Sequence, residues 1–286
     1  HIPLIQYVRK HNRFAVAMRK VDPSITLVGV GEIIGFGGWS EGMLKSCADH
    51  MEHISEHFYC KEKKPIPAHV AQPRERIRIK ADAHRALRKK LPSLKGKDIR
   101  IVLDEWNYWY GPHVYGELGT RYFLKDALGI AAGIHEMVRN SDLFLMANYA
   151  QTVNVIGCIK TTKTDVAFAT TGLVLKLYRK HFGVLPLKVA GVPAPLDAAA
   201  ALTEDRKALT VAVVNPTMQE KTIRLNANGF TPAGKGTMWL ITGANSMLYN
   251  EPGRPPQVVI QEKKIDDAVN LIVPPLSVVL YRLPAK

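Results

Sequence analysis

Two adjacent carboxylates, Asp104 and Glu105, stand immediately before a run of aromatic residues that includes Trp109. The apolar run Ile101-Val102-Leu103 leads into them and predicts a buried strand that ends at the carboxylates. In β/α barrels, catalysis takes place at that end of the strands. A carboxylate among aromatic rings suits sugar chemistry, because the rings stack on a sugar while the carboxylate stabilises an oxocarbenium-like transition state. Two solvated charges at a strand end are an equally weighted alternative.

Polar residues also end two further predicted strands. The first strand ends with Ser55-Glu56-His57-Phe58-Tyr59. At the end of the second strand, the polar residues lie in the run from Ala147 through Gln151 to Asn154. A single histidine or glutamine is more often a satisfied structural residue than a site residue. Three strands with polar, aromatic-rich C-terminal ends nevertheless favour one shared site.

The elements that would position these residues alternate between strands and helices up to about residue 175. Nearly continuous apolar runs predict strands at 25–31, 52–59, 99–105 and 143–150, as in a parallel sheet covered on both faces. Apolar residues at three- and four-residue spacing predict helices over 74–91 and 124–139, and an opening helix that stops before Pro23. This rhythm is typical of an α/β fold.

The pattern changes after Gly183, where prolines cluster and helical periodicity fades. Short strands separated by Asn, Gly and Pro turns are predicted at 209–214, 222–225, 237–242, 258–261 and 271–283. Strands of this kind are typical of a β-sandwich. We therefore expect a partial barrel over residues 1–190 and a β-sandwich over residues 191–286.

Composition excludes several classes of protein. The 286 residues are 47% hydrophobic, so the chain can bury a core, and no apolar run approaches the roughly 18 residues of a membrane-spanning helix. The three cysteines lie far apart without CxxC spacing, which favours reduced thiols in the cytoplasm over a zinc site or disulfides. The first residues show neither an initiator Met nor the basic start of a signal peptide.

The chain is basic, with 39 Lys and Arg against 25 Asp and Glu and a net charge of +14. The positive residues concentrate at 61–64 and 74–97, on the outer faces of predicted helices. No helix-turn-helix, RNP or zinc-finger signature accompanies them, so we expect solvated helical faces and no nucleic-acid partner. Acidic polysaccharides, such as pectic or glucuronate-bearing xylan chains, are an alternative partner for this charge.

Four motifs, in this order, resemble glycoside hydrolase family 51, the α-L-arabinofuranosidases. They are Val21-Asp22-Pro23-Ser24-Ile25, His57-Phe58-Tyr59, Asp104-Glu105-Trp106-Asn107 with Trp109, and the run from Ala147 to Asn154. The segment Pro274-Pro275-Leu276-Ser277-Val278-Val279 is similar to the family's closing strand. The resemblance implies a (β/α)₈ barrel followed by a β-sandwich, and we expect neither a cofactor nor a metal ion.

The resemblance also implies roles for individual residues. Glu105 matches the nucleophile of a retaining exo-glycosidase, which removes terminal α-L-arabinofuranosyl groups from arabinan or arabinoxylan through a covalent intermediate. Tyr59 would orient the nucleophile and His57 would lie near the acid/base. Trp109 would line the arabinose site, and Gln151 would bind sugar hydroxyls.

The family's Gly-Asn-Glu motif, which carries the acid/base, is absent from the sequence. A whole barrel takes roughly 250 residues, so the chain resembles strands 5–8 of a barrel. Glu32 follows the first predicted strand and is a speculative substitute, although the family has no Glu there and a solvated loop carboxylate is the alternative. The competing function is an incomplete barrel that binds sugar, or that assembles with a companion chain or with copies of itself through its open sheet edges.

Overall fold

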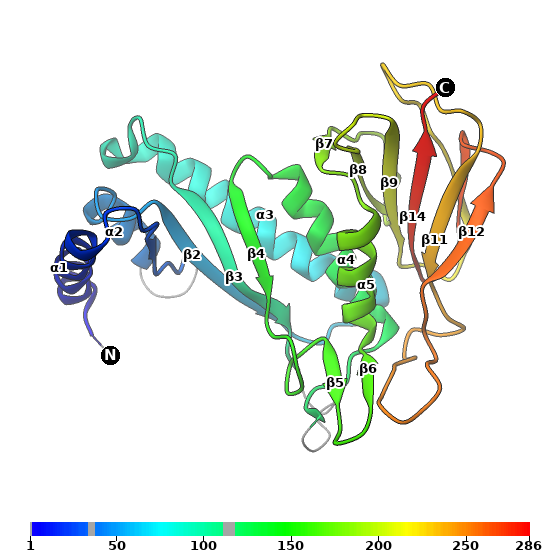
Figure 1. The fold of residues 1–286 in the computed structure, drawn as a ribbon, viewed down its shortest axis with the longest axis horizontal. Helices are drawn as coiled ribbons and strands as arrows, with labels where there is room; N and C mark the ends of the chain where they lie inside the picture. The colour runs from blue at the N-terminus through cyan, green and yellow to red at the C-terminus, as the bar shows by residue number, and fades with distance from the viewer. Residues whose placement is uncertain (1, 34–37, 111–117) are drawn as a thin grey trace. The chain divides into compact units, whose positions relative to one another are not determined.

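The computed structural model describes residues 2–33, 38–110 and 118–286 (Figure 1). They form two compact units, each built from several stretches of the chain. The first unit comprises His1–Tyr59, Arg76–Trp106 and Asn140–Ala150. The second comprises Cys60–Glu75, Asn107–Arg139 and Gln151–Lys286.

A four-stranded sheet contains the four strands predicted for the first part of the chain. Its members, in the order β1-β2-β3-β4, are β1 (Val28–Gly29), β2 (His53–Cys60), β3 (Arg100–Tyr108) and β4 (Phe144–Tyr149). β1 pairs with β2 and β3 pairs with β4 in parallel, as the apolar runs predicted. β1 is much shorter than the predicted 25–31, because only Val28 and Gly29 pair with β2.

The helices are α1 (Leu4–Val21), α2 (Trp39–Ser46), α3 (Ile66–Lys90), α4 (Leu124–Arg139) and α5 (Thr170–His181), with a 3₁₀ turn at Pro92–Leu94. α1 ends at Val21 because Pro23 disfavours helical backbone at the residue before it. None of the helices in the described part of the chain has the length and apolar character needed to cross a membrane.

α3 begins eight residues before the predicted start at residue 74, and it contains Pro73. A proline inside a helix lacks the N–H that would bond to the carbonyl four residues earlier, here that of His69. The hydroxyl of Tyr108 donates to this carbonyl at 2.7 Å, and the side-chain amide of Gln72 donates to it at 3.3 Å. The helix therefore continues through the proline because other groups satisfy the orphaned carbonyl.

The β-rich part forms a six-stranded sheet in the order β12-β11-β14-β9-β8-β7, a two-stranded sheet of β10 and β13, and the hairpin of β5 and β6. The bounds are β5 (Ile159–Thr161), β6 (Val166–Phe168), β7 (Leu185–Leu187), β8 (Asp197–Leu202), β9 (Ala208–Asn215), β10 (Lys221–Arg224), β11 (Gly236–Ile241), β12 (Gln261–Ile265), β13 (Asn270–Val273) and β14 (Ser277–Pro284). Apolar side chains from both sheets, such as Val211 and Leu271, form one buried cluster. The two sheets thus pack face to face as a sandwich.

Two strand predictions in this part need correction. The strand expected at 258–261 lies instead at Gln261–Ile265, because the N–H of Val258 donates to the side-chain oxygen of Asn250 and not to a neighbouring strand. The strand expected at 271–283 divides into β13 and β14 around Pro274-Pro275. The predicted domain boundary at residue 190 falls in the segment between β7 and β8 and stays a prediction.

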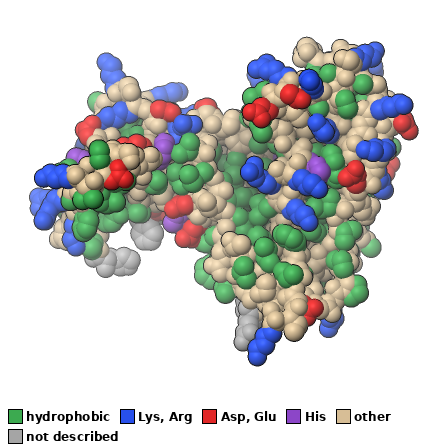
Figure 2. Space-filling model, in the orientation of Figure 1, with side chains coloured by type: hydrophobic (Ala, Val, Ile, Leu, Met, Phe, Trp, Pro, Cys, Tyr) green, Lys and Arg blue, Asp and Glu red, His purple; other side chains and the backbone are tan. Residues whose placement is uncertain are grey.

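Charged side chains are dispersed on the face drawn in Figure 2. Lys and Arg side chains occur there at many separate places, and Asp or Glu side chains lie among them. On this face the positive charge is therefore mixed with negative charge, as on ordinary solvated surfaces.

Candidate active site

A bulge in β3 brings both carboxylates of the Asp-Glu pair to one face. Leu103 pairs with Ala147 and Trp106 pairs with Tyr149, so two residues of β3 oppose one residue of β4. Consecutive residues of a regular strand point to opposite faces, and a bulge re-aims them. Both Asp104 and Glu105 accordingly contact side chains of β2 that lie two residues apart and share a face.

Glu105 contacts Tyr59 directly. The Tyr59 hydroxyl donates to Oε2 of Glu105 at 2.8 Å. Burial first, and then the neighbouring Glu105, raise the pKa of Tyr59, so the hydroxyl keeps its proton and acts as the donor. The contact holds the Glu105 carboxylate in one orientation and occupies one of its two oxygens.

His57 lies beside the other carboxylate. Its Nε2 atom is 2.8 Å from Oδ1 of Asp104 and 3.2 Å from the hydroxyl of Ser55. Both side chains of the His57–Asp104 pair are about two-fifths exposed, at 38% and 41%, so the pair is accessible to a ligand.

Glu32 lines a cavity of about 200 Å³ together with His57, Phe58, Tyr59, Arg76 and Lys80. The structure therefore brings three of the predicted site residues, Glu32, His57 and Tyr59, around one cavity, and Tyr59 connects it to Glu105. A cavity of this size is below the usual range for drug-sized ligands. It is large enough for a few water molecules or a substituent of a sugar.

A buried ion pair that sequence reasoning missed supports the segment carrying Glu32. Glu56 and Lys80 are 1% and 2% exposed, and their charged atoms lie 2.7 Å apart. Glu56 also accepts hydrogen bonds from the Ser40 hydroxyl at 2.6 Å and from the Ile33 N–H at 3.1 Å. The same Ser40 hydroxyl accepts the N–H of Glu32 at 2.7 Å. A charged residue inside an otherwise buried strand was the available signal, since such a charge requires a partner.

Trp109 and Gln151 belong to the second unit. The Trp109 side chain is exposed, whereas its backbone is bonded on both sides: its N–H donates to Cys60, and its carbonyl accepts from the Lys61 ammonium, both at 2.9 Å. The backbone of Gln151 bonds to Ile156 and Cys158, and its side chain is exposed. The side-chain amide of Gln151 donates to the carbonyl of Val153 at 3.3 Å. Both predicted sugar-binding residues are therefore exposed, and the backbone of each is hydrogen-bonded.

Lys160 is fully buried and holds two segments together, donating to the carbonyls of Leu118 at 2.9 Å and Val155 at 3.2 Å. Burial lowers the pKa of Lys160 to about 8 from an ordinary value of 10.5. Between pH 8 and pH 10.5, Lys160 binds a proton in the unfolded chain but not in the folded chain. The free energy of unfolding therefore rises with pH over this window. We expect the free energy of unfolding of the wild type to rise over this window by up to about 3 kcal/mol relative to Lys160→Met.

Urea denaturation of both proteins across this pH window measures the difference. Since other titrating groups are common to the two proteins, they cancel in the comparison. Parallel pH profiles for the wild type and Lys160→Met would show that Lys160 has an ordinary pKa.

Comparisons with known proteins agree on one family. Residues 104–277 match the family model described as the α-L-arabinofuranosidase C-terminal domain. A probable α-L-arabinofuranosidase C of Aspergillus flavus is 28% identical over 98% of this chain and 61% of its own length. An intracellular exo-α-(1→5)-L-arabinofuranosidase of Bacillus subtilis is 27% identical over 79% of this chain and 51% of its own length.

The structural similarity covers nearly the whole chain. The crystal structure of an α-L-arabinofuranosidase from Thermotoga maritima in complex with arabinose superposes with a TM-score of 0.88 at 24% identity, over 99% of this chain and 63% of that one. The predicted fold class, part of a β/α barrel followed by a β-sandwich, is confirmed. The chain spans about three-fifths of the length of these relatives.

Proposed function

Because the chain belongs to the family of the α-L-arabinofuranosidase C-terminal domain, we propose that it is the nucleophile-bearing part of a retaining exo-glycosidase. The substrates are arabinan- or arabinoxylan-type carbohydrates with terminal α-L-arabinofuranosyl groups. One observation carries the proposal: the Glu105 carboxylate, in the C-terminal half of β3, is oriented by the Tyr59 hydroxyl near the end of β2. β3 continues to Tyr108, three residues beyond the predicted end of the strand at Glu105. The names of the Aspergillus and Bacillus relatives support the substrate class.

In the proposed reaction, Glu105 attacks the anomeric carbon while the bond to the leaving-group oxygen breaks. The product is a covalent arabinosyl-enzyme, which water hydrolyses with net retention. Tyr59 donates to Oε2 of Glu105, which leaves Oε1 for the attack. Trp109 and Gln151 of the second unit are proposed as sugar-binding residues, the first for stacking on a sugar ring and the second for hydrogen bonds to its hydroxyls.

The leaving group must receive a proton, and Glu32 is the proposed source within this chain. It lines the same cavity as Tyr59, the partner of Glu105. A retaining mechanism needs the two carboxyl groups about 5–5.5 Å apart. The test of the whole proposal is hydrolysis of an activated aryl α-L-arabinofuranoside by the wild type, by Glu105→Gln and by Glu32→Gln, with and without azide.

A second candidate function is an incomplete barrel that assembles with a companion chain or with another copy of itself. In the first unit, apolar side chains are exposed on both edge strands and on α1, among them Val28 at 42%, Met146 at 48% and Phe14 at 65%. Unpaired strand edges and exposed apolar surface favour association. A cytoplasmic location is also proposed, and the name of the Bacillus relative as intracellular supports it.

Association should be visible in the purified chain. We expect its average mass in sedimentation velocity to rise with concentration, and Met146→Lys, which places a charge on the exposed edge strand β4, to reduce the rise. Lys89→Glu, on an exposed face of α3, is the control and should leave the mass unchanged. A wild type that remains monomeric at the highest concentration contradicts self-association.

A further inference from the structure

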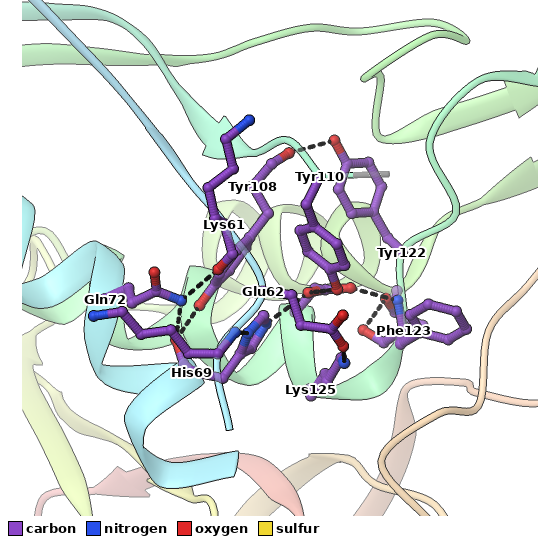
Figure 3. A network of polar contacts seen from close by, with 12 residues as sticks. Lys61, Glu62, His69, Gln72, Tyr108, Tyr110, Tyr122, Phe123 and Lys125 are labelled. Carbon is purple, nitrogen blue, oxygen red and sulfur yellow. Dashed lines mark hydrogen bonds and ion pairs between the residues drawn. The ribbon is translucent and has the colours of Figure 1, made fainter. Parts of the chain in front are cut away.

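Asp126, in the first turn of α4, is the centre of a fully buried polar network in the second unit. Its Oδ1 atom lies 2.8 Å from Nε2 of His69 and accepts the Tyr110 hydroxyl at 2.7 Å. Its Oδ2 atom accepts the N–H of Phe123 at 2.7 Å. Figure 3 labels His69, Tyr110 and Phe123, which come from different parts of the chain and lie close together there.

The hydrogen-bond network determines the direction of each of these bonds. Nδ1 of His69 accepts the backbone N–H of Lys63 at 3.3 Å, so this nitrogen carries no proton. The proton of the neutral ring is therefore on Nε2 and is donated to Asp126. Burial, followed by the charge of Asp126, raises the pKa of Tyr110, so its hydroxyl is also a donor. The carboxylate of Asp126 thus accepts three hydrogen bonds and donates none.

The network extends from Asp126 to the backbone around Trp109. Tyr108 donates to the carbonyl of His69, which Pro73 leaves without a helical donor, and Gln72 bonds to that carbonyl and to the carbonyl of Lys61. Figure 3 shows Tyr108, Gln72 and Lys61 gathered around His69. Since Lys61 in turn donates to the Trp109 carbonyl, the segment 60–63 and the segment 108–110 are held against each other.

Trp109 differs from its two neighbours in this segment. Tyr108 and Tyr110 are buried, at 0% and 4% exposure, and both are bonded into the network, whereas the indole of Trp109 is 46% exposed. An exposed indole on a rigid backbone offers a flat apolar face and loses little conformational entropy when a sugar stacks on it.

We infer that Asp126 is a positioning residue for substrate binding: through Tyr110 and His69 it holds the segment that presents the Trp109 indole to an arabinofuranosyl ring. The identity of the ring rests on the proposed function. The positioning itself rests on the contacts of Asp126.

Asp126→Asn keeps the size of the side chain but removes its purely accepting character. An amide presents one oxygen and one NH₂ group, so in either orientation the NH₂ group faces at least one of the three donors. Asp197 supplies a matched control in the same unit, because it is also buried and lies 2.6 Å from a histidine, His135, that contacts a tyrosine hydroxyl. Asp197 belongs to β8 and pairs with Arg74 and Arg139.

Two measurements on the full chain test the inference. Hydrogen–deuterium exchange at the Trp109 amide, which is bonded to Cys60, reports the positioning without any sugar. Titration with methyl α-L-arabinofuranoside reports the consequence for binding. We expect Asp126→Asn to speed exchange at Trp109 and to weaken binding about tenfold, the same factor that we expect for Trp109→Ala. Asp197→Asn should leave both quantities unchanged even where it lowers thermal stability.

Unchanged exchange at Trp109 in Asp126→Asn overturns the inference, and so does faster exchange with undiminished sugar affinity. If Asp126→Asn does not fold, Tyr110→Phe replaces it, since it removes one donor to Asp126 and should speed exchange at the same amide. A wild type that binds no arabinoside contradicts the proposed function instead. The exchange measurement distinguishes the two failures because it requires no ligand.

Discussion

Glu105→Gln is expected to lower the turnover of para-nitrophenyl α-L-arabinofuranoside by about 10³-fold or more. The glutamine retains the size of the side chain and its contact with the Tyr59 hydroxyl, but a neutral amide does not form the covalent intermediate. An activated aryl leaving group needs little assistance from an acid, so this substrate tests the nucleophile separately from the acid/base. Release of nitrophenol, followed by absorbance, measures the rate.

Asp82→Asn is the control, because Asp82 is an exposed carboxylate on α3 in the same unit. Its turnover should equal that of the wild type. Equal turnover by Glu105→Gln and the wild type would exclude Glu105 as the nucleophile. A wild type that is folded but inactive would favour the incomplete barrel over the glycosidase.

Azide and Glu32→Gln distinguish the possible sources of the acid/base. Azide attacks the arabinosyl-enzyme without a general base, so it accelerates turnover where the base is missing. If Glu32 is the acid/base, Glu32→Gln slows the hydrolysis of arabino-oligosaccharides far more than that of the aryl substrate, and azide restores only the latter. If Glu32 has no catalytic role, Glu32→Gln and the wild type respond to azide alike.

Lys80→Met is expected to lower the free energy of unfolding by about 3–5 kcal/mol, because it leaves the buried Glu56 carboxylate without its counter-charge. The double variant Glu56→Leu/Lys80→Met should recover part of this loss, since an apolar pair replaces the ion pair. The recovery is partial because the Ser40 hydroxyl and the Ile33 N–H lose Glu56 as their acceptor. Urea denaturation of the wild type, both single variants and the double variant forms a complete cycle.

The control for this cycle lies on the same helix. Lys90 pairs with Glu41 at 2.6 Å, but both side chains are largely accessible, at 64% and 38%. Lys90→Met should therefore change stability by no more than about 1 kcal/mol. If Lys80→Met and Lys90→Met lowered the free energy of unfolding equally, the burial of the Glu56–Lys80 pair would have no energetic consequence.

The double variant should also affect the segment that carries Glu32. Glu56 bonds to Ser40 and Ile33, and Ser40 bonds to Glu32, so Glu56→Leu removes this support even where stability recovers. Stability and the position of Glu32 are thus separate consequences of one buried carboxylate.

The sequence by itself determined the elements and the order of the fold. Apolar runs and helical spacing depend on neighbouring residues, so they predicted the four parallel strands, the helix Leu124–Arg139 and the change to a β-rich part. The motif residues also identified the family, and they singled out Tyr59 and Glu105, whose side chains the structure brings into contact. Their catalytic roles stay predictions.

Only the tertiary structure decided how the side chains of the site are aimed and supported. The bulge that turns both Asp104 and Glu105 to one face is a property of the pairing between β3 and β4, which no local pattern encodes. The helix passes through Pro73 because Tyr108, distant in sequence, satisfies the freed carbonyl. The partners of Glu56 and Asp126 come from other elements as well. Buried polar groups require partners, and which partners they find depends on the packing of the whole chain.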